Sequence, residues 1–168
     1  SDVCSSDLFP SVAVDVRNMI AFQGDQVLVA SYPAEFIGGF ETVSNLYAAS
    51  SVTRVTEMVT FGTSTVDMLS LGGIIEAQSG SSGGAVANPW NRLVGIVTTT
   101  STGTTTADRN LRAITTGYID RDMRDQSGTS LTDMLAGNLT KQLEYFSTDE
   151  LPSITKLFVD VLLQKYQN

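Results

Sequence analysis

The chain contains no histidine among its 168 residues, and this absence limits its chemistry more than any other feature. Histidine is the side chain that most often serves as a general base near neutral pH. A single cysteine, Cys4, excludes an internal disulfide. No apolar run approaches the roughly 18 residues of a membrane span, and no signal peptide opens the chain. The formal net charge of −8 argues against a nucleic-acid or anionic-membrane partner, which would need a basic face.

The composition is that of a folded globular protein. Apolar residues make up 42% of the chain, and the mean hydropathy is close to zero at +0.06. A length of 168 residues is enough for one domain with a buried core, or for one and a half. Nothing in the sequence predicts a metal site or an organic cofactor.

The first eight residues, SDVCSSDL, show no strand or helix period. They resemble the translation of a common sequencing-library adapter, and the alternative is an ordinary polar tail. On the adapter hypothesis residues 1–8 are not part of the natural protein, Cys4 carries no redox information, and the reading frame is cut on its N-terminal side.

Residues 9–119 have the pattern of a β protein. Short alternating or apolar segments are separated by glycine, proline and asparagine at hairpin spacing. The predicted strands lie within 26–32, 38–51, 52–62, 65–73, 93–100 and 111–119. About six short strands of this kind favour a sandwich or a barrel.

Residues 120–168 change to a helical pattern. Apolar residues recur at helical spacing in two stretches. Thr129 or Ser130 is a candidate cap for the first helix, and Ser147 or Ser153 for the second. The apolar positions are Leu131, Met134, Leu135, Leu139 and Leu143 in the first helix and Ile154, Phe158, Val161 and Leu162 in the second. The predicted fold is therefore mostly β, followed by a C-terminal α-helical extension.

The segment SGSSGGAV, residues 79–86, is the part of the sequence that indicates a chemical function. A flexible glycine–serine linker is one interpretation, but a compact apolar strand follows too soon. A phosphate-binding loop would need a lysine and a helix directly after it, and neither is present. The Gly80-x-Ser82-x-Gly84 pattern also matches the nucleophile elbow of α/β-hydrolases. That motif requires a helix after the turn, and here the next element is a strand.

In its strand context the segment resembles the trypsin-like, chymotrypsin-fold serine peptidases, whose nucleophile lies in Gly-x-Ser-Gly-Gly. The strand LVGIVTTT follows it as in that family, and GDQVLVASYPAEFIGG upstream is similar to the opening of the second barrel in the bacterial extracytoplasmic Deg/HtrA-type branch. The resemblance covers roughly residues 9–119. It implies the second β-barrel of a chymotrypsin-like double barrel, and a protein that works outside the cytoplasm.

The resemblance assigns roles to individual residues. Ser82 would be the nucleophile, and the backbone N–H groups of Gly80 and Ser82 would form the oxyanion hole. Ser81 stands where relatives often have Asp or Asn. The edge that pairs with an extended peptide or protein substrate would be Thr98, Thr99 and Thr100.

Glu76 falls where relatives place the floor of the primary specificity pocket. A carboxylate at that floor would favour a basic substrate side chain. The alternative is that Glu76 faces solvent.

In this family the histidine and aspartate of the triad precede the serine and come from the N-terminal barrel. The resemblance therefore implies that this chain is the C-terminal part, and that its missing N-terminal barrel is its partner. Asp15, Asp25 and Asp67 are present, but no family motif places the triad aspartate at any of them. Two functions remain open: the second half of an active serine endopeptidase, or a catalytically inactive relative that binds peptides.

Overall fold

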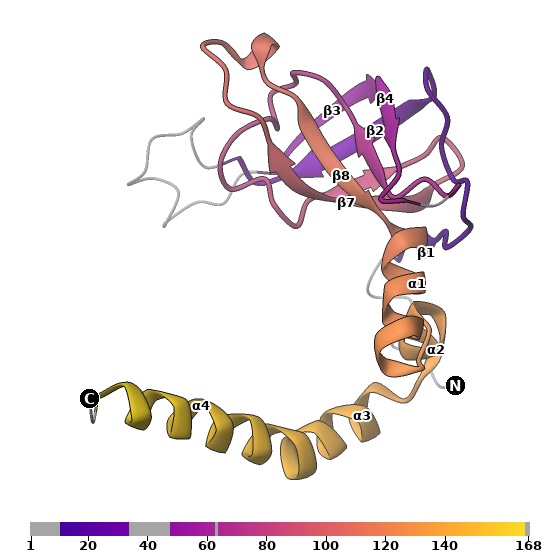
Figure 1. Ribbon diagram of the computed structural model, residues 1–168. Helices are drawn as coiled ribbons and strands as arrows, with labels where there is room; N and C mark the ends of the chain where they lie inside the picture. The colour runs from indigo at the N-terminus through magenta and orange to yellow at the C-terminus, as the bar shows by residue number, and fades with distance from the viewer. Residues whose placement is uncertain (1–10, 34–47, 63, 167–168) are drawn as a thin grey trace, which may run out of the picture. The chain divides into compact units, whose positions relative to one another are not determined.

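The computed structural model describes residues 11–33, 48–62 and 64–166, and these divide into two compact units with a boundary after Leu131. The first unit carries a β-sheet and one helix (Figure 1). The predicted adapter, residues 1–8, and most of the predicted strand at 38–51 lie outside the described residues. A mostly β fold followed by helices, as the sequence predicts, is confirmed.

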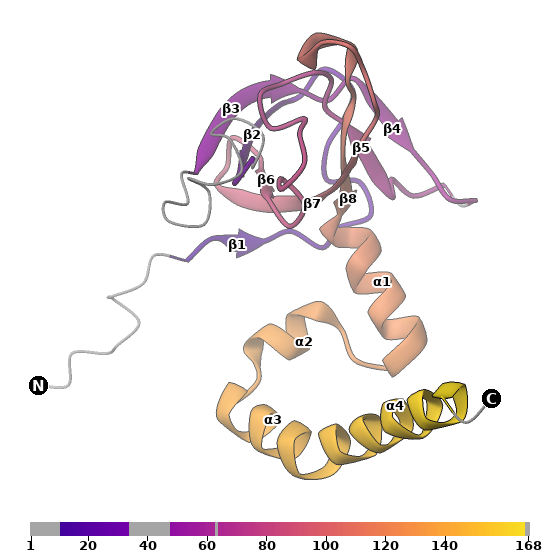
Figure 2. The ribbon, with the colours of Figure 1, turned by 90° about the vertical axis from the view of Figure 1, so that its left-hand side faces the viewer.

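The strands form an eight-stranded sheet in the order β3-β2-β6-β7-β8-β5-β4, with β1 pairing parallel to β7 (Figure 2). The bounds of the strands are β1 Ala13–Val14, β2 Gln26–Ser31, β3 Ala49–Arg54, β4 Glu57–Val59, β5 Met68–Ser70, β6 Ala85–Ala87, β7 Arg92–Thr100 and β8 Leu111–Thr115.

The sheet curls into a barrel because its two end strands are neighbours in sequence. Only Val55 and Thr56 separate β3 from β4. The N–H of Thr56 donates to the Ser70 carbonyl at 2.8 Å, so this connection is bonded to β5. The inward-facing residues of several strands then meet in one apolar core. The core side chains include Val27, Val29, Leu69, Leu71, Val86, Val94, Val97, Leu111 and Ala113.

The predicted strand at 111–119 is only half right. β8 ends at Thr115, and helix α1 runs from Thr116 to Ser127. The Thr115 hydroxyl caps α1 by accepting the N–H of Tyr118, and Gly128 ends the helix in the left-handed conformation with φ 73°. Both are standard helix-end signals. They outweigh the β-branched run that suggested a longer strand.

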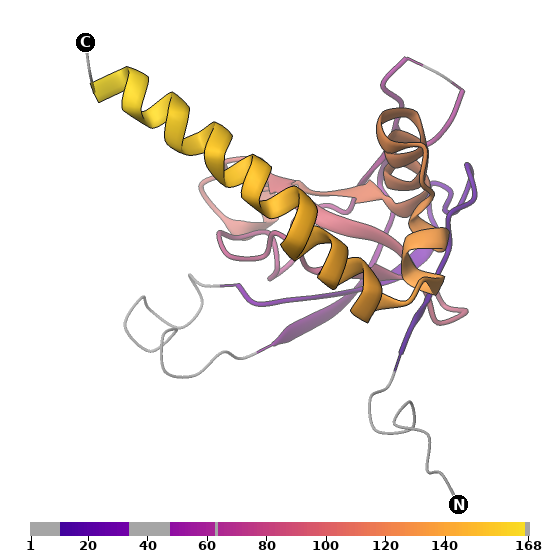
Figure 3. The same ribbon diagram turned by 90° about the horizontal axis from the view of Figure 1, so that it is seen from below.

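The first predicted helix, which places Leu131 to Leu143 on one helix, is divided in two, because Asn138 caps a new helix after Gly137. Helix α2 covers Leu131–Ala136, directly after the predicted cap Ser130, and α3 covers Leu139–Tyr145. A π turn, η4 (Phe146–Glu150), then leads without a break into α4 (Leu151–Tyr166) (Figure 3).

Neither predicted cap of the second helix begins a helix, because Ser147 and Ser153 both lie inside this continuous rod. Their hydroxyls donate instead to the carbonyls of Glu144 and Asp149, as serines within helices do. Pro152 lacks the N–H that an α-helix needs at that point, and the extra residue of the π turn precedes it.

An ion pair between Asp15 and Arg17 lies directly after β1, where the chain joins the barrel. Arg17 Nε–H donates to both oxygens of the buried Asp15 carboxylate, at 2.8 and 3.1 Å. This hydrogen bonding is the main reason why the pKa of Asp15 lies below its usual range. The Asp15 carbonyl accepts the Thr116 hydroxyl, so the pair also connects to the start of α1.

The depressed pKa of Asp15 predicts an acid-labile contribution to stability. A carboxyl whose folded pKa is lowered stabilises the fold fully above the ordinary aspartate range of about 4, and this contribution is lost as the pH falls through the lower folded pKa. We therefore expect the free energy of unfolding in urea to drop on acidification below about pH 4. Asp15→Asn should reduce that drop, whereas a pH profile identical to wild type would show that the pair contributes nothing.

Candidate active site

The Gly80–Gly84 loop lies between a turn-rich segment and strand β6, and it is bonded to the neighbouring strand β7. The N–H of Gly83 donates to the Val97 carbonyl at 2.8 Å, and the N–H of Val97 donates to the Gly84 carbonyl at 2.8 Å. Within the loop, the N–H of Gly84 donates to the Ser81 carbonyl at 3.0 Å. These bonds hold the loop as a fixed turn, as a nucleophile loop requires.

Glycine is needed in this loop for two different reasons. Gly80 and Gly83 have φ of 91° and 86°, which side chains other than glycine rarely adopt. Gly84 is needed for space: a Cβ there would lie 2.6 Å from the Ser31 Cβ and 2.8 Å from the Ala30 carbonyl oxygen. The loop therefore fits against the end of β2 only with glycine at this position.

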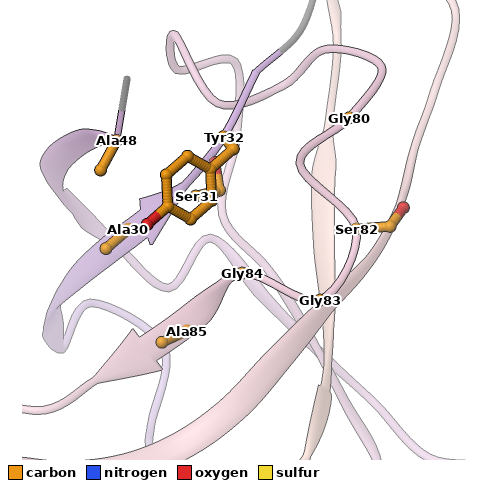
Figure 4. Close-up of a pocket in the computed structure, with 9 residues that line it drawn as sticks. All are labelled: Ala30, Ser31, Tyr32, Ala48, Gly80, Ser82, Gly83, Gly84 and Ala85. Atoms are coloured by element: carbon orange, nitrogen blue, oxygen red, sulfur yellow. The ribbon is translucent and has the colours of Figure 1, made fainter. Parts of the chain in front are cut away.

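Ser82 is exposed, and its hydroxyl donates to the Thr98 carbonyl at 3.1 Å. Its side chain points away from Ala30, Ser31 and Tyr32 (Figure 4). A carbonyl oxygen accepts a hydrogen bond but does not take up a proton at neutral pH. The sequence contains no histidine, so the chain offers no imidazole that could take up the Ser82 proton. That Ser82 is a nucleophile stays a prediction.

The backbone N–H groups of Gly80 and Ser82 were expected to form an oxyanion hole. Within the described ranges, neither N–H donates to an acceptor of the chain, whereas the neighbouring Gly83 and Gly84 N–H groups do. That the Gly80 and Ser82 N–H groups converge on one oxygen stays a prediction.

A contact that the sequence did not predict supports the loop from beneath. Ser81 is 1% exposed and Ser31 is 3% exposed, and the Ser31 hydroxyl donates to the Ser81 hydroxyl at 3.1 Å. The two serines are fifty residues apart, so no local pattern could have indicated the contact. This hydroxyl contact joins the residue directly before Ser82 to the end of β2.

A cavity of about 340 Å³ opens between the end of β2 and the loop (Figure 4). Tyr32 forms one wall, and the glycines of the loop form the opposite wall. The lining residues are Ala30, Ser31, Tyr32, Ala48, Gly80, Ser82, Gly83, Gly84 and Ala85. Its walls are largely apolar, so it can accept a small apolar group next to Ser82.

Glu76 is fully buried, at 0% exposure, and the alternative in which it faces solvent is wrong. The turn that contains it folds inward, with the N–H of Ala77 donating to the Ile74 carbonyl and the N–H of Gln78 donating to the Glu76 carbonyl, both at 2.8 Å. Among the described residues, neither carboxylate oxygen of Glu76 has a hydrogen-bond partner. Buried carboxylates are usually paired, so this one is an energetic cost or a ligand-binding group.

Thr98, Thr99 and Thr100 form the end of β7, and β8 pairs with one side of this segment. On the other side, β6 pairs no further along β7 than Ile96. The next residue, Val97, is hydrogen-bonded to the loop through Gly83 and Gly84. Beyond Val97, the described residues leave this edge of β7 without a paired strand, and the Thr98 carbonyl accepts the Ser82 hydroxyl. An extended peptide could add to this edge as a further strand.

The three aspartates of the β unit that the sequence left without a role are engaged in structural contacts. Asp15 pairs with Arg17, and Asp25 accepts the N–H of Phe22 at 2.9 Å. Asp67 pairs with Arg121. Within the described ranges, no group of three or more His, Cys, Asp or Glu residues could hold a metal ion, and no helix is long and apolar enough to cross a membrane.

No family model matches the chain, and no curated protein matches it. Among solved structures, the chain is similar to kallikrein-related peptidase 10, with 20% sequence identity and a TM-score of 0.44. The match covers 70% of this chain and 58% of the other, so this chain spans little more than half the length of that protein.

Proposed function

We propose that this chain is the nucleophile-bearing part of a trypsin-like serine endopeptidase of the Deg/HtrA-type branch, in which Ser82 attacks a peptide bond. The observation that carries the proposal is the exposed Ser82 hydroxyl on a fixed glycine loop, beside the unpaired edge of β7. The histidine and aspartate of the triad would come from an N-terminal barrel outside this chain.

In this proposal, residues of the chain would have separate roles in peptide-bond cleavage. Thr98, Thr99 and Thr100 would pair with the substrate backbone and bring its carbonyl carbon to the Ser82 oxygen. The N–H groups of Gly80 and Ser82 would stabilise the negative charge that develops on the carbonyl oxygen. The proton of Ser82 would pass to the base of the other barrel, which requires the hydroxyl to leave the Thr98 carbonyl. The resemblance would make Glu76 the floor of the specificity pocket, but Glu76 is fully buried and is not among the residues that line the cavity beside Ser82.

A second function is a peptide-binding protein without catalysis. The hydrogen bond of Ser82 to a carbonyl oxygen, in a sequence without histidine, favours it. Peptide addition at the β7 edge needs no base. Imidazole added in solution distinguishes the two functions, because a free base can replace a missing one.

We expect the isolated chain to hydrolyse no peptide and to react only very slowly with a fluorophosphonate probe, because a positioned base contributes about 10²–10⁴-fold to such steps. Added imidazole should accelerate labelling in proportion to its concentration, with the modified residue identified as Ser82 by mass spectrometry. Ser82→Ala should abolish the imidazole-dependent labelling. Ser50→Ala, an exposed serine on β3, is the matched control and should label as wild type does.

Two results would contradict the enzymatic proposal. Equal labelling of Ser82→Ala would place the reactive group elsewhere. Failure of imidazole to accelerate labelling of the folded chain, together with measurable peptide binding, would favour the non-catalytic function.

A further inference from the structure

A second cavity, of about 330 Å³, lies where β7 continues past the Ser82 site. Thr98, whose carbonyl accepts the Ser82 hydroxyl, is two residues before Thr100, which lines this cavity. Two residues of a strand span about 7 Å. The cavity therefore begins two strand residues after the carbonyl that accepts the Ser82 hydroxyl. Its lining residues are Ser79, Thr100, Ser101, Thr102, Gly103 and Arg109.

Arg109 contributes a positively charged side chain to this wall. Arg109 is half-buried, and one of its Nη groups donates to the Ala77 carbonyl at 3.0 Å, which fixes the guanidinium at the wall. A guanidinium is charged at every physiological pH. Among the described residues that line the cavity, none is acidic. Glu76, the neighbour of Ala77, is 0% exposed and does not reach the lining.

We propose that this cavity receives the substrate side chain that precedes the cleaved bond and selects an acidic one, with Arg109 as the specificity-determining residue. The inference rests on the proposed function, because it takes Ser82 as the site of cleavage. A carboxylate entering the cavity gains a charge-assisted contact with Arg109. The hydroxyls of the wall can donate to its oxygens. A lysine or arginine side chain would bring a like charge to the guanidinium.

This proposal opposes the expectation based on Glu76, which predicts a basic side chain. The proposal and the expectation differ in which charged side chain would contact the substrate side chain. Arg109 lies in the cavity wall, whereas Glu76 is beneath the surface with no access to the cavity. Electrostatic contacts act most strongly on the group that is in direct contact, so the structure favours the acidic side chain.

The test is binding of product-type peptides, which requires no catalytic base. Three fluorescent peptides that are identical except for a C-terminal Glu, Gln or Lys are titrated with the full chain, and fluorescence anisotropy is measured. We expect the Glu peptide to bind about tenfold more tightly than the Gln peptide, and the Lys peptide to bind most weakly. Arg109→Ala should abolish the preference, and Arg109→Lys should retain part of it.

The matched control is Arg112→Ala, which removes the same charge from an exposed position on β8 outside the cavity. It should keep the preference for Glu. Circular dichroism and thermal melts establish that each variant is folded. If Arg109→Ala does not fold, the Arg109→Lys variant and the peptide series on the wild type still decide the matter.

Tighter binding of the Lys peptide would overturn the proposal and restore the expectation based on Glu76. Equal binding of the three peptides, or no binding of any, would also overturn it. The proposed function fails differently, through absent Ser82 labelling, so a Glu preference without labelling would leave an acid-selective peptide-binding site. Labelling of Ser82 without a Glu preference would remove only the role of Arg109.

Discussion

Replacing Asp67 with alanine is expected to lower the free energy of unfolding of the β unit by about 3–5 kcal/mol. Asp67 is 2% exposed and accepts three groups from different parts of the chain. The Phe61 N–H donates to it at 2.6 Å, the Thr65 hydroxyl at 2.9 Å, and the Arg121 guanidinium forms an ion pair with it. Removing the carboxylate leaves these donors without their acceptor.

The position of Asp67 explains why the effect should be large. Arg121 is on α1, whereas Asp67 directly precedes β5, so the pair joins the helix to the barrel. Arg121 also donates to the Asn18 side chain at 2.8 Å and lies 5.8 Å from the Tyr118 ring centre. A loss of this size is a large part of the 5–15 kcal/mol that stabilises a typical domain.

The measurement is urea unfolding followed by circular dichroism. Asp125→Ala, which removes an exposed carboxylate from α1, is the control and should change stability by less than about 0.5 kcal/mol. A double-mutant cycle with Arg121→Ala should give a favourable coupling energy between the two side chains. Equal stabilities of the Asp67 and Asp125 variants would show that the buried pair does not hold α1 to the barrel.

Replacing Glu76 with methionine is expected to raise the free energy of unfolding by about 1–3 kcal/mol. Both carboxylate oxygens of Glu76 are buried without a partner among the residues that the structure describes, and such groups lose their hydration without compensation. Methionine has a similar length and an unbranched, adaptable shape, so it should fill the same volume. An increase would mean that the fold carries Glu76 at a cost, as binding sites often do.

The control is Glu57→Met on β4, an exposed position where the same substitution should have little effect. Thermal and urea unfolding of both variants measure the difference. A decrease in stability of Glu76→Met would show that the carboxylate is satisfied in solution by a bound water or ion. The peptide titrations, repeated on this variant, separate stability from ligand selection.

Some properties of the site residues follow from the local sequence, and others do not. The exposed Ser82 and the positive φ of Gly80 and Gly83 follow from the local loop pattern, which a short motif can convey. The burial of Glu76 and the presence of Arg109 in a cavity wall do not. They depend on how the 74–79 turn packs against the β7–β8 connection, which lies about thirty residues further along the chain.

For the helices too, the local sequence predicted some features and not others. Helical spacing alone predicted helices in the C-terminal part, because apolar periodicity is a local property. It did not predict that α3, η4 and α4 join, since a serine can cap a helix or donate to a carbonyl inside one. Helix α1 was missed although its cap Thr115 and its terminating Gly128 are both visible in the sequence. The β-branched residues before it fit a strand equally well.

The sequence by itself determined the mostly β class, the strand segments at 26–32, 65–73 and 93–100, the glycine loop around Ser82 and the absence of histidine. These are matters of composition, alternation and glycine placement, which act over a few residues. Only the tertiary structure decided the Ser31–Ser81 contact, the Asp67–Arg121 pair, the burial of Glu76 and the charge in the second cavity. Each of these depends on segments about thirty to fifty-four residues apart that meet when the sheet curls into a barrel, and no pattern along the chain records which side chains will meet there.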